Sequence, residues 1–143
     1  RALRRELPFL LSIPFAEDSR LFVRGQIDLL ILDAGGVTVL DYKHARASEA
    51  DDYRFQLDAY ALAARRLYPS APSVSAGLVF LKEADPTPTV EVVPPTLAPE
   101  VRLAQLGAEL AQARATDEWA GRPIDTCRAI RCGYVYRCHP DRP

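Results

Sequence analysis

The first 43 residues carry the apolar and β-branched runs that are typical of β-strands. Residues 7–15 form an apolar and aromatic run, and residues 21–32 form a second one. The segment Asp33-Ala34-Gly35-Gly36 then gives a strong hairpin turn signal before a third run at residues 37–43. The pattern therefore predicts a three-stranded antiparallel meander.

The period changes to that of an α-helix over residues 51–68. Apolar side chains recur there at helical spacing, namely Tyr53, Leu57, Tyr60, Ala64 and Leu67. Strands are expected at residues 74–81 and 89–93, and a second long helix from Pro99 to Gly121. The order β-β-β-α-β-β-α predicts an α/β fold with a mixed central sheet flanked by helices, followed by an irregular tail.

Composition changes this picture little. Hydrophobic residues make up 48% and charged residues 26% of the chain, which is typical of a globular domain. No apolar run approaches the roughly 20 residues of a membrane helix, and no secretory signal is visible, so we expect a cytoplasmic protein. The net charge of −1 excludes a broad electrostatic footprint on nucleic acid. We expect residues 1–118 to form the core, truncated at its N-terminus, and residues 119–143 to pack on it.

Two carboxylates on the meander are the candidate chemistry. A turn centred between Ala34 and Gly35 places Asp28 directly opposite Asp41 on one face, with Lys43 two residues further along that face. Both aspartates have apolar neighbours in the sequence, so the pair needs a compensating cation or a shared proton. Mg²⁺ or Mn²⁺ fits, since such an ion takes one or two carboxylates and keeps water for a substrate. The competing interpretation is a solvated face on which Lys43 makes an ordinary surface salt bridge.

Several motifs together resemble the PD-(D/E)XK nuclease superfamily and, within it, the RecB-type nuclease domain of bacterial helicase–nucleases such as AddA. They are Arg24-Gly25-Gln26-Ile27-Asp28, Val39-Leu40-Asp41-Tyr42-Lys43, the pair Gln56 and Tyr60, and Arg5-Glu6-Leu7-Pro8-Phe9. The resemblance implies a restriction-endonuclease-like core and metal-dependent cleavage of DNA. It also implies helicase motor domains in the same parent chain, a second helicase–nuclease subunit, and a role in processing DNA ends during recombinational repair.

The resemblance also implies a role for each matching residue. Asp28, Asp41 and the carbonyl of Tyr42 would bind the metal, and Lys43 would orient or activate the attacking water. Gln56 and Tyr60 would lie beside the site near the DNA, although simple core packing explains Tyr60 equally well.

The tail holds Cys127, Cys132 and Cys138, which suggest a zinc site or a 4Fe–4S cluster. Some relatives carry a C-x2-C-x5-C tail; the second spacing matches here, and the first is two residues too long. Thiols without a metal, or a tail that contacts DNA through Tyr134 and Tyr136, are the alternatives.

Two other functions remain open at this point. A catalytically silent DNA-binding or scaffolding module would keep the fold without the reaction, and a phosphodiesterase or RNase would keep the site with another substrate.

Overall fold

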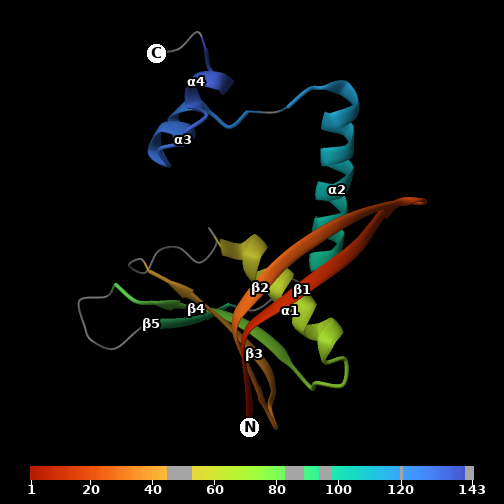
Figure 1. The fold of residues 1–143 in the computed structure, drawn as a ribbon, viewed down its shortest axis with the longest axis vertical. Helices are drawn as coiled ribbons and strands as arrows, with labels where there is room; N and C mark the ends of the chain where they lie inside the picture. Colours follow the sequence, from red (N-terminus) through yellow and green to blue (C-terminus); the bar gives the residue numbers. More distant parts are fainter. Residues whose placement is uncertain (45–52, 83–88, 94–97, 120, 141–143) are drawn as a thin grey trace. The chain divides into compact units, whose positions relative to one another are not determined.

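The computed structural model describes residues 1–44, 53–82, 89–93, 98–119 and 121–140 (Figure 1). The elements follow the predicted order, with two short helices added at the end. They are β1 (Ala2–Ala16), β2 (Ser19–Asp33), β3 (Gly36–Lys43), α1 (Arg54–Leu67), β4 (Val74–Phe80), β5 (Thr89–Val93), α2 (Pro99–Thr116), α3 (Ile124–Ala129) and α4 (Val135–Cys138). The chain divides into two compact units, Arg1–Ala108 and Glu109–Pro143.

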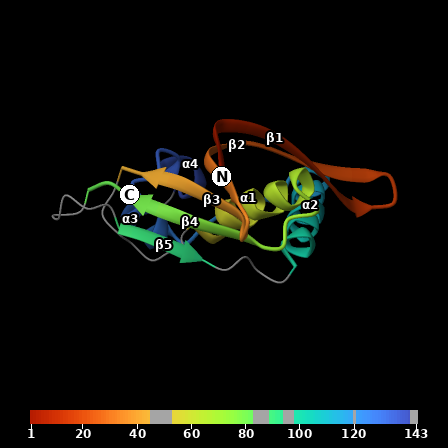
Figure 2. The same cartoon turned by 90° about the horizontal axis from the view of Figure 1, so that it is seen from below.

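The first unit contains one five-stranded sheet in the order β1-β2-β3-β4-β5. β3 and β4 run parallel, and the other neighbouring strands are antiparallel. The parallel pair requires a crossover, which α1 supplies; α1 lies along one face of the sheet (Figure 2). The predicted α/β class, mixed sheet and three-stranded meander are confirmed.

The turn between β2 and β3 forms where the sequence predicts it. Asp33 pairs with Gly36, and the Asp33 carboxylate accepts a hydrogen bond of 2.9 Å from the Gly35 main-chain nitrogen. Gly36 has a φ of +134°, and a Cβ there would collide with the main-chain oxygen of Ser73. Only glycine satisfies both conditions at position 36.

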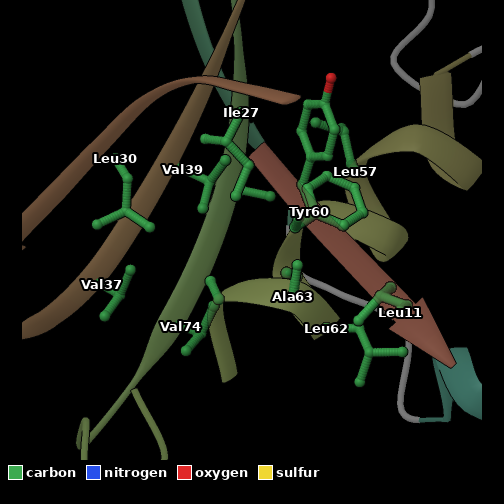
Figure 3. Packing of buried hydrophobic residues seen from close by; sticks show 14 of the residues in the cluster. Leu11, Ile27, Leu30, Val37, Val39, Leu57, Tyr60, Leu62, Ala63 and Val74 are labelled. Atoms are coloured by element: carbon green, nitrogen blue, oxygen red, sulfur yellow. The ribbon is translucent and has the colours of Figure 1, made fainter. Parts of the chain in front are cut away.

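The core lies between the sheet and α1 (Figure 3). Every residue from Leu57 to Ala64 is buried, so α1 is covered on more than the predicted single stripe. Small alanines allow this, because they let the helix approach the strands closely. Leu67, the expected last member of the stripe, is 49% exposed.

Several element boundaries differ from the predictions. β1 begins at Ala2 rather than residue 7, because it pairs with β2 along almost its whole length. α2 ends at Thr116, before Gly121, since Asp117 adopts a left-handed conformation with φ of 54° that stops the helix. Residues 51–52 of the first predicted helix lie outside the described residues.

The tail after α2 was expected to be irregular, but it contains the two short helices α3 and α4. The expected division after residue 118, and the packing of the tail on the core, stay predictions. Within the described part of the chain, no helix is long and apolar enough to cross a membrane.

Candidate active site

Asp28 lies where β2 separates from β3. The predicted register holds from Asp33–Gly36 to Leu29–Leu40, and the ladder stops one residue before Asp28. The simple hairpin predicted that Asp28 and Asp41 would be a ladder pair, and this prediction is wrong. Instead, Asp28 Oδ2 accepts a hydrogen bond of 2.9 Å from the main-chain nitrogen of Tyr42, the residue after Asp41.

A local irregularity explains this placement. Ile27 and Leu30 are both buried although they are three residues apart, so the inward alternation of β2 changes at Asp28. The pairing of β1 with β2 passes from Arg5–Leu29 to Leu7–Ile27 and so leaves out Glu6 and Asp28. Glu6 has a φ of 50°. The Asp28 carboxylate is thus directed toward β3 at the break in the ladder, and not into the core.

Asp41 is the buried carboxylate of the site, with 3% of its surface exposed. Its Oδ2 lies 2.7 Å from Lys43 Nζ, as an ion pair, and its Oδ1 accepts a hydrogen bond of 2.9 Å from Gln56 Nε2. The Lys43 side chain retains 19% exposure. The pair is therefore not the solvated surface salt bridge of the competing interpretation.

Gln56 connects the members of the site from the first turn of α1. Its Oε1 accepts a hydrogen bond of 2.8 Å from Lys43 Nζ, while its Nε2 also donates one of 2.8 Å to the Tyr60 hydroxyl oxygen. The amide group of Gln56 therefore contacts Asp41, Lys43 and Tyr60. The helical spacing of four residues that the sequence shows brings Gln56 and Tyr60 together, as expected.

Tyr60 belongs to both the core and the site. Its ring packs edge-on against Phe9, with centroids 5.7 Å apart, and its hydroxyl lies at the rim of the apolar cluster (Figure 3). The hydroxyl makes a long hydrogen bond of 3.5 Å to Asp41 Oδ1. Burial raises the pKa of Tyr60, and the charges of Asp41 and Asp28 raise that pKa further against the opposing effect of the Gln56 hydrogen bond. Tyr60 is accordingly a neutral hydrogen-bond donor at physiological pH.

A hollow of about 370 Å³ lies beside Asp28. Its lining consists of Leu3, Arg5, Glu6, Asp28, Leu29 and Tyr42. The Tyr42 side chain is 47% exposed and alternates with Asp41 and Lys43, which places it on the other face of the sheet. Asp28 is partly exposed and lines this hollow.

The residues present fit a hard divalent cation. Asp41 Oδ2 is buried, and among the described residues no donor forms an aligned hydrogen bond with it; its contact is the Lys43 ion pair. Two carboxylates and a nearby main-chain carbonyl are hard oxygen donors, which Mg²⁺ prefers. Within the same described ranges, no three His, Cys, Asp or Glu residues form a metal cluster, so the protein would supply only part of the ligand shell.

The cysteine prediction finds no support. Cys127, Cys132 and Cys138 are free thiols, and neither they nor His139 form a metal-binding group in the part of the chain that is described. Burial raises the pKa of the Cys127 thiol, and the neighbouring Cys132 raises that pKa further. His139 instead lies 3.0 Å from the Arg122 carbonyl oxygen.

One aromatic residue of the site does not follow from the sequence pattern. The ring of Tyr53 lies beneath Lys43, with Nζ 4.6 Å from the ring centroid. The helical pattern assigns Tyr53 to the core stripe. The available signal was its position three residues before Gln56, on the same side of the helix.

Comparisons with known proteins show the family of the chain. The family model of the PD-(D/E)XK nuclease superfamily matches residues 1–139. The chain is 40% identical over 76 residues to an ATP-dependent helicase/nuclease subunit of Desulforudis audaxviator (strain MP104C). That match covers 43% of this chain and 6% of the relative, so the chain spans a small part of that protein's length.

A structural comparison supports the fold. The crystal structure of SSO0001 superposes with a TM-score of 0.61 at 17% identity, over 95% of this chain and 59% of that one. At this identity the likeness shows the fold alone. The fold and the family match together lead to one conclusion: the chain belongs to the PD-(D/E)XK nuclease superfamily.

Proposed function

We propose that this chain is a divalent-metal-dependent nuclease domain that hydrolyses the phosphodiester bonds of DNA. The observation that carries the proposal is the ion pair at 2.7 Å between the buried Asp41 and the partly buried Lys43, held by Gln56 next to the point where Asp28 leaves the ladder. Structural carboxylates on a strand need no lysine, amide and phenol gathered around them. Such a cluster is typical of a catalytic centre.

Each residue has a role that its position supports. Asp28, Asp41 and the Tyr42 carbonyl would hold Mg²⁺ or Mn²⁺, which supplies charge neutralisation and a more acidic water when bound. Lys43 carries a positive charge next to those carboxylates, where it orients the attacking water and stabilises negative charge on the phosphate. Gln56 and Tyr60 hydrogen-bond to Asp41 or Lys43 and so keep them in place, and the family resemblance implies a position beside the DNA for both.

The wider context comes from the matched relative. The likeness to a helicase/nuclease protein favours a domain that works beside helicase motor domains in one parent chain and with a second helicase–nuclease subunit. DNA-end processing in recombinational repair, in the cytoplasm, follows from that assignment. The alternative is a silent DNA-binding or scaffolding module, which the intact Asp28, Asp41 and Lys43 set disfavours.

Calorimetric titration of Mg²⁺ and Mn²⁺ into the wild-type chain and into Asp41→Asn tests the proposal. Cleavage of linear DNA and of RNA of matched sequence is measured on the same preparations. Asp33→Asn is the matched control, because Asp33 lies on the same hairpin and its turn hydrogen bond to Gly35 is one that asparagine also makes.

We expect saturable binding and DNA cleavage in the wild type and in Asp33→Asn, and loss of both in Asp41→Asn. Binding without cleavage of either substrate would favour the silent module. Cleavage of RNA alone would favour the RNase. Absence of binding in the wild type would refute the metal site.

A further inference from the structure

The Lys43 ammonium has a neighbour that the proposed reaction does not account for. Its Nζ lies 4.6 Å from the ring centroid of Tyr53, within the distance at which a cation is attracted to the face of an aromatic ring. Tyr53 precedes α1 and is half-buried. It is not among the motif residues that resemble the nuclease superfamily, and no metal or substrate role falls to it.

The ring is held independently of Lys43. It meets the ring of Phe80 edge-on, with centroids 6.5 Å apart and an interplanar angle of 65°. Phe80 is fully buried and is the partner of Lys43 in the parallel β3–β4 ladder. The Leu81 nitrogen donates a hydrogen bond of 3.0 Å to the Lys43 carbonyl oxygen, so the lysine backbone is fixed to the same strand. Tyr53 thus presents an aromatic surface that packs against β4, the strand paired with the segment that carries Lys43.

Lysine needs such a surface because its side chain is flexible. The ammonium is a point charge on four methylene groups, and its three N–H donors rotate freely. The Asp41 carboxylate at 2.7 Å and the Gln56 carbonyl at 2.8 Å engage the ammonium from two directions. The face of an aromatic ring attracts the positive charge, but unlike the two oxygens it has no lone pair that accepts a hydrogen bond. Together, the ion pair, the hydrogen bond and the ring contact restrict the position of Nζ.

We propose that Tyr53 is a positioning residue, whose ring holds the Lys43 ammonium in its reactive place. The inference rests on the proposed nuclease function, because it gives Lys43 the role stated there. Tyr53 itself touches neither substrate nor metal in this proposal. Its effect is on the turnover rate through Lys43, and the affinity for DNA is unchanged.

A spectroscopic measurement tests the positioning without any activity. The chain has only two lysines, Lys43 and Lys82, so selective ¹³C labelling of lysine gives two ε-methylene signals. The exposed Lys82 serves as an internal reference. We expect an upfield ring-current shift of the Lys43 signal in the wild type and in Tyr53→Phe, and its loss in Tyr53→Leu. Equal positions of the two lysine signals in the wild type would overturn the proposal.

Kinetics test the consequence. We expect Tyr53→Leu to lower kcat by about 5- to 20-fold with KM for DNA within twofold, and Tyr53→Phe to keep the wild-type rate. Phenylalanines with one, two and three ring fluorines at position 53 keep the shape but weaken the negative ring face progressively. We expect kcat to fall in that order, which a packing role would not produce.

Phe55→Leu is the matched control, because Phe55 is an exposed aromatic residue two positions further along the chain. We expect it to leave kcat unchanged, and thermal unfolding of each variant reports any loss of folding. An unchanged kcat in Tyr53→Leu, or equal rates across the fluorinated series, would overturn the proposal. A ring-current shift in a chain that cleaves no nucleic acid would refute the nuclease function and leave the Tyr53–Lys43 contact established.

Discussion

The Gln56 amide nitrogen donates a hydrogen bond of 2.9 Å to Oδ1 of Asp41, across fifteen positions of sequence. The same side chain accepts a hydrogen bond from Lys43. The amide is therefore engaged with protein groups on both of its ends. Its position supports a role in orienting the acidic and basic residues of the site, in addition to the expected role near the DNA.

Gln56→Glu tests that role. The substitution keeps the shape of the side chain but replaces the donor facing Asp41 with a carboxylate oxygen, so two acceptors meet. We expect a loss of about 1–3 kcal/mol in the free energy of unfolding, together with a reduced kcat. Chemical denaturation and DNA cleavage measure the two effects. Gln105→Glu, on the exposed side of α2, should change neither; an unaltered Gln56→Glu enzyme would contradict the orienting role.

Lys43→Ala should abolish cleavage while Mg²⁺ or Mn²⁺ still binds. The substitution removes the positive charge beside the reacting phosphate, and loss of one such stabilising group costs about 10²–10³-fold in rate. The carboxylates of Asp28 and Asp41 remain, so calorimetry should still detect the cation. Lys82→Ala, the change of the other lysine, is expected to behave as the wild type. Full activity of Lys43→Ala would rule out the proposed role of this lysine.

Stability at alkaline pH should depend on Tyr60. Burial raises the pKa of Tyr60 above its ordinary value of 10.0, so the folded protein retains the phenolic proton where the unfolded chain has released it. The folded state then binds more protons, and stability falls as pH rises through 10. Below that pH, the raised pKa contributes nothing to the pH dependence. Urea denaturation from pH 8 to 11 should show a steeper decline in the wild type than in Tyr60→Phe, and parallel curves would contradict the shift.

Gly36→Ala should destabilise the β2–β3 hairpin. A Cβ at this position meets the main-chain oxygen of Ser73, and the φ of +134° is one that side chains rarely adopt. We expect a loss of about 1–3 kcal/mol in the free energy of unfolding, measured by thermal or urea denaturation. Gly121→Ala is the control, since a Cβ there has no neighbour within 4 Å. Similar stabilities for the two variants would show that the turn tolerates a side chain.

The sequence predicted the elements well wherever local chemistry decides them. The Asp33 to Gly36 turn, the register up to Leu29 and Leu40, and the Gln56–Tyr60 pairing all depend on residues close in sequence. Helix ends were less predictable. α2 stops at Thr116 because Asp117 turns left-handed, although Gly121 carries the usual stop signal.

The sequence by itself determined the order of the elements and the family, and it predicted the side chains of the candidate site. These features depend on residue type and on spacing within single elements, which the chain states directly. Tertiary structure alone decided three things: that Asp28 leaves the ladder to bind the Tyr42 nitrogen, that Gln56 contacts both Asp41 and Lys43, and that Tyr53 lies under the lysine. Each depends on where β1 disturbs β2, or on how closely the buried alanines let α1 approach β3. Those distances arise from packing between distant segments, and no local pattern encodes them.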